Sequence, residues 1–568
     1  MENKVARVMP LSTGSRTGHG GKRHFSVAST LATFIFALLV LGSGNAADPV
    51  GVWMKFEASF QSDRSYENPL YDVNRFEVSF TSPSGRVQKI QGFWDGGRSW
   101  KVRFAPDERG IWTYTTQCSD DSNSGLHERE GRFEVVSHDS KHDIYTRGAV
   151  IRPWGGYHLA HADGTPFFWT ACTAWNGPLK ATDAEWRTYL QDRAGKNYNV
   201  IQFVTTQWRG GDADRQGRVA FQGSGRIQID PEFFQRLDRK IDLINEYGLV
   251  AAPVLLWALP SGQGRHLSPG YYLPDQEAVL LARYLVARYG GNQVVWFLGG
   301  DGRYIDEYEQ RWKVIGRGVF GEEHPGLVAQ HPHGRSWIGA AYAGEPWLDI
   351  VGYQSSHSSQ ERTVNWINKG PVSEQWDQLP PRPIINLEPI YEQVHADTTP
   401  QDVRNASYWS VFAAPPSGIS YGANGLWSWR REGEKILNHR DAPWAGTWRE
   451  SLELAGGAQI GYLSEFMQRF EWWKLKPGQE LLADQPGDEV FNHFISVLRT
   501  DDFKEILVYT PVKTSIRLYN PLRLQYRAQW FDPAANQYSE SQKIGADGVL
   551  SCSSPLENDA LLILRLTR

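Results

Sequence analysis

Cysteine is scarce in this chain of 568 residues, which contains only Cys118, Cys172 and Cys552. These three residues lie far apart, in what we expect to be three different domains. A disulfide framework of the kind that stabilises small exported domains is therefore not expected. The fold must depend on hydrophobic cores, and a chain of this length is too long for one core, so it predicts several domains.

The chain also lacks an excess of charge of either sign. Its 59 Lys and Arg residues face 64 Asp and Glu residues, which gives a formal net charge of −5. No basic run occurs beyond the N-terminal segment, and basic patches are what attract nucleic acids and anionic membranes. We therefore expect no nucleic acid as a partner and, for the mature form, no membrane.

Several motifs that would identify a cofactor or a nucleophile are missing. The chain contains no G-x-S-x-G, no Walker loop, no dinucleotide fingerprint and no helical H-E-x-x-H. His331 and His333 are two residues apart, which is not the spacing of a zinc-binding pair on a helix. These histidines are better suited to hydrogen bonding or packing, and we expect neither a metal nor another cofactor.

Long apolar runs are absent except near the N-terminus. Lys22 and Arg23 precede an apolar run from about Val27 to Leu41, and small residues follow up to Ala47. This order predicts that residues 1–47 are a signal peptide and that the mature protein is secreted, periplasmic or at the cell surface. The alternative is an uncleaved anchor, but the run is shorter than the ~20 residues of a membrane span.

Aromatic residues, in contrast, are abundant: 24 Trp, 24 Tyr and 25 Phe. Most of them must fill cores, because large rings bury the most apolar area. The remainder suit a sugar ligand, since flat and weakly polar rings stack on sugar faces.

Residues 48–146 and 478–568 alternate apolar and polar side chains between turn signals, the pattern of half-buried strands. Each segment predicts a β-sandwich. The clearest strands expected in the first are 75–80, 100–104, 112–115 and 133–135, and in the second 506–509, 516–518, 526–531 and 560–566.

Residues 147–477 instead alternate buried apolar runs with amphipathic stretches. Thr182 and Glu185 form a capping box for one helix, and Asp230 with Pro231 begins another. Strands are expected at 166–171, 199–204, 249–257, 293–298, 327–331, 348–353, 384–388 and 418–429. Eight such units predict a central (β/α)8 TIM barrel flanked by N-terminal and C-terminal β-sandwich domains, with the weakest helix signals in the fifth and eighth units.

Two of the predicted barrel strands end in acids. The fourth strand runs into Gly299-Gly300-Asp301, and the seventh ends at Glu388. In such barrels catalytic groups stand at the C-terminal ends of strands. Two carboxyl groups are suited to the cleavage of a glycosidic bond. One protonates the leaving oxygen, while the other acts in the attack on the anomeric carbon from the opposite side. The alternative for each acid is a helix cap or a salt bridge.

Other polar and aromatic side chains are expected near the same strand ends, where they would bind the substrate. They are Trp175, Gln202, Trp257, His331, Tyr353, Trp427 and Trp429.

Four motifs together resemble the apiosidase-like glycoside hydrolase family, relatives of the clan A barrels. They are Thr173-Ala174-Trp175, Gly299-Gly300-Asp301, Asn386-Leu387-Glu388-Pro389 and Gly425-Leu426-Trp427-Ser428-Trp429. The resemblance covers about 147–475. It implies that Asp301 is the general acid/base and Glu388 the nucleophile of a retaining hydrolase that acts on a plant or algal cell-wall polysaccharide or oligosaccharide.

The flanking domains are similar to modules found with such barrels. The first resembles an N-terminal domain of unknown function, and the last resembles a collagen-binding-type sandwich. Two positions depart from the family pattern. Cys172 stands where Asp is common, and Gly300-Asp301 replaces the Asn-Glu of most clan A enzymes.

Two readings without catalysis stay open at this point. The chain could be a carbohydrate-binding protein on a barrel scaffold or, from the C-terminal resemblance alone, a protein that binds the extracellular matrix. The presence of both Asp301 and Glu388 favours the enzyme.

Overall fold

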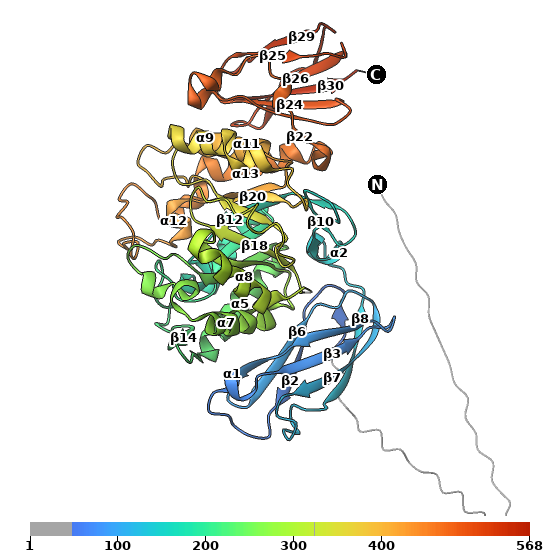
Figure 1. Ribbon diagram of the computed structural model, residues 1–568, viewed down its shortest axis with the longest axis vertical. Helices are drawn as coiled ribbons and strands as arrows, with labels where there is room; N and C mark the ends of the chain where they lie inside the picture. Colours follow the sequence, from blue (N-terminus) through green and yellow to red (C-terminus); the bar gives the residue numbers. More distant parts are fainter. Residues whose placement is uncertain (1–47, 323, 568) are drawn as a thin grey trace, which may run out of the picture. The chain divides into compact units, whose positions relative to one another are not determined.

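A computed structural model describes residues 48–322 and 324–567 (Figure 1). The predicted signal peptide, residues 1–47, lies outside the described residues. Among the residues that are described, no helix combines the length and the apolar character needed to cross a membrane. Their framework consists of three sheet systems that follow one another along the chain.

The first system is a β-sandwich, as predicted. One sheet has the strand order β1-β8-β7-β3-β4 and the other β2-β6-β5. The strands are β1 Val50–Gly51, β2 Phe56–Gln61, β3 Phe76–Thr81, β4 Val87–Gln91, β5 Phe93–Gly96, β6 Ser99–Phe104, β7 Gly110–Cys118 and β8 Glu130–Val136. Apolar side chains of both sheets, among them Phe80, Trp100 and Trp112, form one buried core. The four strands expected from alternation are present, and β1, β2, β4 and β5 were missed.

The second system is a parallel eight-stranded sheet with the order β18-β17-β16-β13-β12-β21-β20-β19. A parallel bridge between Ala329 and Ile350 joins β18 to the segment before β19, so the sheet closes on itself. Its strands are β12 Trp169–Thr173, β13 Val200–Val204, β16 Val250–Trp257, β17 Val295–Gly302, β18 Leu327–Pro332, β19 Val351–Gln354, β20 Ile384–Glu388 and β21 Gly418–Tyr421. The predicted TIM barrel is confirmed.

Helices surround this barrel (Figure 1). The main ones are α4 Asp183–Gly195, α5 Pro231–Glu246, α7 Asp275–Tyr289, α8 Glu309–Phe320, α9 Glu361–Lys369, α11 Pro400–Phe412 and α13 Ala455–Met467. The Thr182–Glu185 capping box is present on α4, and the Asp230 side chain accepts from backbone N–H groups of α5. Turns, and no helix, connect β18 to β19 across the described residues 333–350, in line with the weak signal there.

Two strand predictions need correction. The run 166–171 is split, because β11 (Pro166–Phe167) pairs with β10 (Leu159–His161) in a small separate sheet, and the barrel strand begins at Trp169. The eighth strand ends at Tyr421, and the chain then turns into the short helix α12 (Asn424–Trp427). Aromatic content alone suggested a longer strand, because tryptophan is common both in strands and in buried turns.

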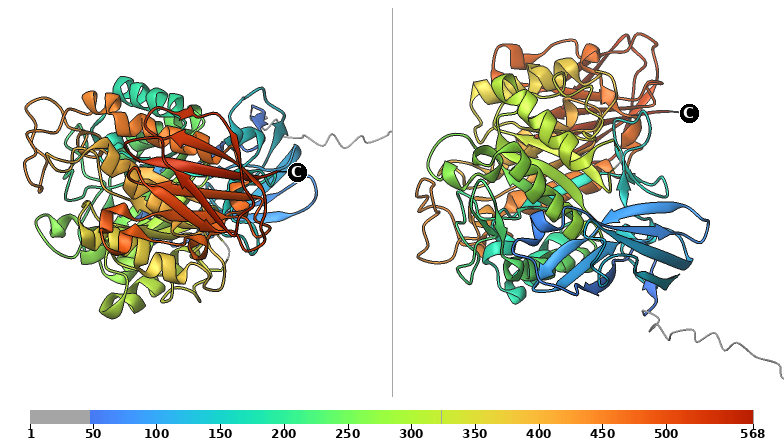
Figure 2. Two further views of the ribbon diagram at one scale, coloured as in Figure 1. Left: turned by 90° about the horizontal axis from the view of Figure 1, so that it is seen from above. Right: turned by 60° about the horizontal axis from the view of Figure 1, so that its bottom comes forward.

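The third system is a second sandwich. Its larger sheet has the order β22-β23-β24-β30-β26-β27, with β28 paired to β26, and a two-stranded sheet joins β25 to β29. Figure 1 shows these C-terminal strands, in red, as a layer of their own beside α9, α11 and α13, and the left view of Figure 2 looks onto them from above. The strands are β22 Lys476–Pro477, β23 Ser496–Arg499, β24 Glu505–Thr510, β25 Ser515–Tyr519, β26 Tyr526–Asp532, β27 Gln537–Tyr538, β28 Gln542–Ile544, β29 Val549–Ser553 and β30 Ala560–Leu566.

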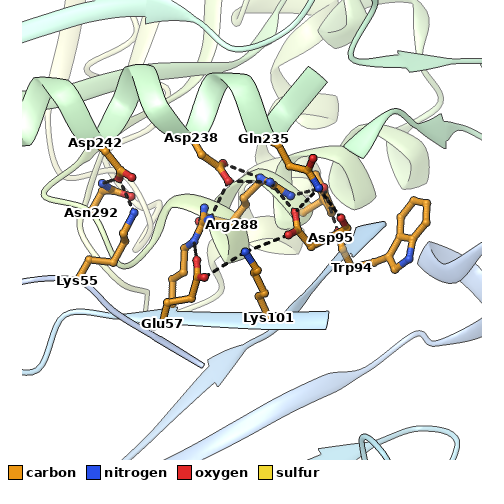
Figure 3. Close-up of polar contacts among 12 residues, drawn as sticks. Lys55, Glu57, Trp94, Asp95, Lys101, Gln235, Asp238, Asp242, Arg288 and Asn292 are labelled. Atoms are coloured by element: carbon orange, nitrogen blue, oxygen red, sulfur yellow. Dashed lines mark hydrogen bonds and ion pairs between the residues drawn. The ribbon is translucent and has the colours of Figure 1, made fainter. Parts of the chain in front are cut away.

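A buried ion-pair network joins the N-terminal sandwich to the barrel helices α5 and α7 (Figure 3). Arg288 of α7 is fully buried and donates to Asp95 of the sandwich and to Asp238 of α5, at 2.7 Å each. Arg103 of β6 also donates to Asp238, at 2.7 Å. Burial would raise the pKa of Asp238, but the two guanidinium groups hold it at about 2, so this carboxylate is charged at neutral pH.

Arg288→Met is therefore expected to lower the free energy of unfolding by about 3–5 kcal/mol, because it leaves Asp95 and Asp238 buried with less compensating charge. Urea unfolding of the mature chain would measure the loss. Lys55→Met is the matched control in the same interface. Its pair with Asp242 is 22% and 29% exposed, and exposed pairs contribute only ~0–1 kcal/mol. Equal losses in the two variants would contradict the role of the buried network.

Candidate active site

Asp301 and Glu388 line one cavity of about 710 Å³ at the C-terminal ends of the barrel strands. Known ligand pockets fall in the range ~300–1,000 Å³, so a mono- or oligosaccharide unit can enter. Trp175, Trp257 and Trp427 line the same cavity. The structure thus brings together two strand-end acids and three of the predicted aromatic residues.

The backbone conformation at Asp301 departs from that of a regular strand. Asp301 has φ 48°, in the left-handed region, and the pairing of β17 with β18 shifts register on both sides of Gly300. A non-glycine residue in this region costs of the order of 1–3 kcal/mol and occurs often at functional sites. The neighbouring glycines are needed for packing, because a Cβ at Gly300 would meet the ring of Trp257 at 2.7 Å.

Glu388 is the last residue of β20 and is only 6% exposed. An imidazole faces each of its carboxylate oxygens. Nε2 of His331 lies 3.0 Å from Oε2, and Nε2 of His357 lies 3.0 Å from Oε1. The backbone N–H of Asp301 donates to Nδ1 of His331 at 3.2 Å, so the proton of that neutral ring is on Nε2. Nε2 of His331 and Oε2 of Glu388 are close but are not aligned as a hydrogen bond.

The pKa values of the two acids are shifted in opposite directions. Burial, followed by the negative charge of Glu388, raises the pKa of Asp301 to about 7, although His331, Arg209 and His357 act against the shift. Burial would also raise the pKa of Glu388, but His331 and His357 hold it well below its usual range. Below pH about 7 the pair therefore holds one proton that Asp301 can donate and one carboxylate on Glu388.

The three tryptophans differ in what their indole N–H groups do. Nε1 of Trp175 donates to the Tyr391 hydroxyl and Nε1 of Trp427 donates to Asn424, both at 2.8 Å. Nε1 of Trp257 is buried without a hydrogen-bond partner among the described residues. This nitrogen has almost no exposed surface, so Trp257 presents its ring, and not this N–H, to the cavity.

Trp427→Ala is expected to weaken sugar binding by ~1–3 kcal/mol, the scale of aromatic stacking on a flat ligand. The ring lies in the cavity wall and packs 4.6 Å from the His439 ring. Titration of a cognate oligosaccharide into the variant would measure the loss. Trp154→Ala is the control, because that ring is fully exposed and outside the cavity lining. Equal binding by the Trp427 variant and the unmodified chain would exclude stacking on this ring.

Four of the predicted substrate-binding residues do not line the cavity. Gln202 is fully buried inside the barrel, where it donates to the Leu387 carbonyl at 3.0 Å. His331 is likewise fully buried and reaches the cavity only through its contact with Glu388. We therefore interpret Gln202 as structural and His331 as a residue that positions Glu388.

The side chains of Tyr353 and Trp429 point away from the cavity. Tyr353 packs 5.5 Å from Trp366 of α9, while the next residue of the strand, Gln354, lines the cavity. Successive side chains of a strand face opposite sides, so the prediction was wrong by one residue. Trp429 is fully buried and stacks 4.8 Å from Trp448. It follows the helix α12, which turns its ring away from the cavity.

Several cavity-lining residues were absent from the predicted set. They are Arg209, Gln354, Tyr391 and His439. The strand alternation could have identified Gln354. Arg209 and His439 lie on loops without any periodic signal, and only the fold brings these loops together. In the described part of the chain, no group of three His, Cys, Asp or Glu residues is arranged to hold a metal ion.

Models of known protein families match two parts of this chain. The family model described as "Apiosidase-like, catalytic domain" matches residues 154–474, more than half of the chain. The chain belongs to the apiosidase-like family. It is accordingly a glycoside hydrolase, and its substrate is a carbohydrate. A second model, for a domain of unknown function (DUF5060), matches residues 49–119 in the N-terminal sandwich of this apiosidase-like chain. A search of the curated proteins finds no match.

Solved structures share the fold at low identity. A protein described as a glycoside hydrolase is 23% identical, with a TM-score of 0.63, over 74% of this chain and 97% of its own. A family 5 glycoside hydrolase from Bacteroides vulgatus ATCC 8482 is 24% identical, with a TM-score of 0.63, over 74% and 94%. A candidate glycoside hydrolase from the same organism is 17% identical, with a TM-score of 0.65, over 92% of this chain and 100% of its own.

Proposed function

We propose that the apiosidase-like chain is a secreted enzyme that cleaves a glycosidic bond of a plant or algal cell-wall polysaccharide by a retaining two-step mechanism. One observation carries this proposal. Asp301 and Glu388 line the same cavity at strand ends, and their surroundings shift their pKa values in opposite directions. A protonated acid beside an ionised carboxylate is the arrangement that acid-assisted displacement at an anomeric carbon requires.

In the first step, a carboxylate oxygen of Glu388 forms a bond to the anomeric carbon. The bond from that carbon to the leaving oxygen breaks, and the leaving oxygen takes both electrons together with the proton of Asp301. The product is a glycosyl ester on Glu388, with Asp301 now ionised. The buried imidazole of His331 holds the attacking carboxylate in place.

In the second step, Asp301 accepts a proton from a water molecule as the water oxygen bonds to the same carbon. The ester bond breaks, and its electrons return to Glu388. Asp301 has therefore acted first as acid and then as base, and the two displacements together retain the anomeric configuration. Following the anomer that is released first, by proton NMR of the hydrolysis, tests the mechanism. Initial release of the inverted anomer would reject it.

The pH dependence follows from the same pair. For a substrate with a poor leaving group, kcat/KM is expected to fall as the pH rises through about 7, because Asp301 must be protonated and its pKa is raised to about 7. Glu388, with its lowered pKa, stays ionised well into the acidic range. A pH profile of kcat/KM measures both the alkaline limb, set by Asp301, and the acidic limb, set by Glu388. A substrate with a good leaving group should lack the alkaline limb, and the same limb on both substrates would argue against Asp301 as the acid.

The substrate source and the location are proposed on other grounds. The N-terminal sequence has the layout of a signal peptide, and the family resemblance is to enzymes of cell-wall breakdown. Hydrolysis screens with pectic, xylan and algal polysaccharides would identify the substrate. Detection of the mature chain, beginning near Asp48, outside producing cells would support secretion, and retention of an intact N-terminus in the cell would contradict it.

A further inference from the structure

The ring of His357 lies between two oxygen atoms. Its Nδ1 is 3.0 Å from the carbonyl oxygen of Pro389, and its Nε2 is 3.0 Å from Oε1 of Glu388. A carbonyl oxygen can only accept a hydrogen bond, so Nδ1 of His357 must carry a proton. In a neutral ring Nε2 would then be bare, and its lone pair would face a carboxylate oxygen.

The other oxygen of Glu388 shows which side holds the second proton. Oε2 lies 3.0 Å from Nε2 of His331, and that nitrogen carries a proton because the Asp301 N–H donates to Nδ1 of the same ring. The two atoms are not aligned as a hydrogen bond, and neither has another partner among the described residues, but an N–H this close to Oε2 favours the ionised form of Glu388. With Glu388 ionised, the contact at Oε1 is a hydrogen bond only when Nε2 of His357 carries the proton.

We infer that His357 is an imidazolium in the resting enzyme and that, with the guanidinium of Arg209, it is a fixed positive charge that compensates whichever of Asp301 and Glu388 is ionised. The first half of this inference rests on hydrogen-bond geometry alone. The second half rests on the proposed two-step mechanism, in which the negative charge moves from Glu388 to Asp301.

The charge count shows what the imidazolium contributes. In the resting site Glu388 carries −1, His357 carries +1 and Asp301 is protonated. In the glycosyl ester Glu388 is neutral, Asp301 has lost its proton and carries −1, and His357 is unchanged. These three groups thus sum to zero in both states, and Arg209 in the wall of the same cavity adds +1 to each. The negative charge is therefore compensated in each step, and no step leaves it unpaired in this buried site.

The ring is held where both acids can use it. It packs 4.3 Å from the Tyr391 ring, and the side chain of His395 hydrogen-bonds to the His357 carbonyl at 2.8 Å. The other ionisable groups around the cavity are Glu388, Asp301, His331, Tyr391, His395, Arg209, His439, Arg440 and Asp441. Burial and the charge of Arg209 lower the pKa of His439 to about 4, so His439 is neutral and does not supply this cation.

Nitrogen NMR of the mature, full-length enzyme labelled with ¹⁵N-histidine tests the protonation directly. Between pH about 5 and 7, one ring that is absent from the spectrum of His357→Gln should show two protonated nitrogens. The double variant Asp301→Asn, Glu388→Gln removes both negative charges and should convert that signal to a neutral ring. A neutral His357 in the unmodified enzyme would overturn the inference. The NMR measurement needs no turnover, so its outcome does not depend on whether the mechanism retains or inverts the anomeric configuration.

The balancing role is tested by pH profiles of kcat/KM. In His357→Gln, the amide can still donate to Glu388 but has no charge, so the pKa values of both acids should rise. Both limbs should then move to higher pH, by about one unit. His333→Gln is the control, because its ring hydrogen-bonds to the Gly334 carbonyl and does not line the cavity. An unshifted His357→Gln profile beside an observed imidazolium would refute the balancing role, whereas initial release of the inverted anomer would instead refute the proposed mechanism.

Discussion

Glu388→Gln is expected to abolish turnover of every substrate, natural or activated, with a loss of roughly 10⁴-fold or more in kcat. The amide keeps the shape of the side chain, but it is too weak a nucleophile to form the glycosyl ester. The loss cannot be recovered by a better leaving group, because the missing group is the one that attacks. Steady-state rates on a cell-wall oligosaccharide and on an aryl glycoside measure it.

Folding of the Glu388→Gln variant is expected to be preserved. The amide can occupy the same position at the end of β20, although its NH₂ group faces either His331 or His357. Gln354→Ala is a useful comparison, since this residue lines the same cavity from β19 but carries no charge. It should reduce activity far less. Substantial hydrolysis of an aryl glycoside by Glu388→Gln would show that another group is the nucleophile.

Asp301→Asn is expected to separate natural from activated substrates. It should reduce hydrolysis of natural glycosides by ~10²–10⁴-fold, because their leaving oxygen needs a proton. An aryl glycoside with an acidic phenol needs little assistance, so its first step should be nearly spared. A burst of phenol followed by slow turnover would report accumulation of the glycosyl ester, since the second step then lacks its base.

Azide provides the decisive control for this assignment. In Asp301→Ala the anion should attack the accumulated ester without base assistance, restore turnover of the aryl glycoside and give a glycosyl azide of retained configuration. The same addition should not rescue Glu388→Gln, where no ester forms. Equal losses on natural and aryl substrates in both variants, with no rescue, would reject the assigned roles even though the barrel is correct.

The barrel could be predicted from the sequence because its signals are local. The run Ile384–Glu388 is bounded by prolines and emerges as β20 at the expected residues, and the capping box of Thr182 and Glu185 begins α4 as expected. Apolar runs of strand length, separated by capped amphipathic helices, leave few alternatives to a parallel closed sheet. Strand-end acids then follow from the strand boundaries alone.

Side-chain direction at the strand ends was less predictable. In β19 the prediction chose Tyr353, which packs on α9, when the next residue, Gln354, is the one that lines the cavity. Apolar runs that are buried on both faces carry no alternation to set the phase. The same limit affects Trp429, since hydrophobic content did not show that the chain turns into α12 after Tyr421.

The sequence by itself determined the two sandwiches, the barrel and the pair Asp301 and Glu388, because each depends on the order of residues within one short element. Only the tertiary structure decided which charges and hydrogen bonds surround that pair. His331, His357 and Arg209 come from separate barrel units, and their positions relative to the acids depend on the closure of the sheet and on loops without periodic signal. The protonation states that suit the two acids to catalysis are set by these non-local contacts, because electrostatic interactions depend on distance in space and not on separation along the chain.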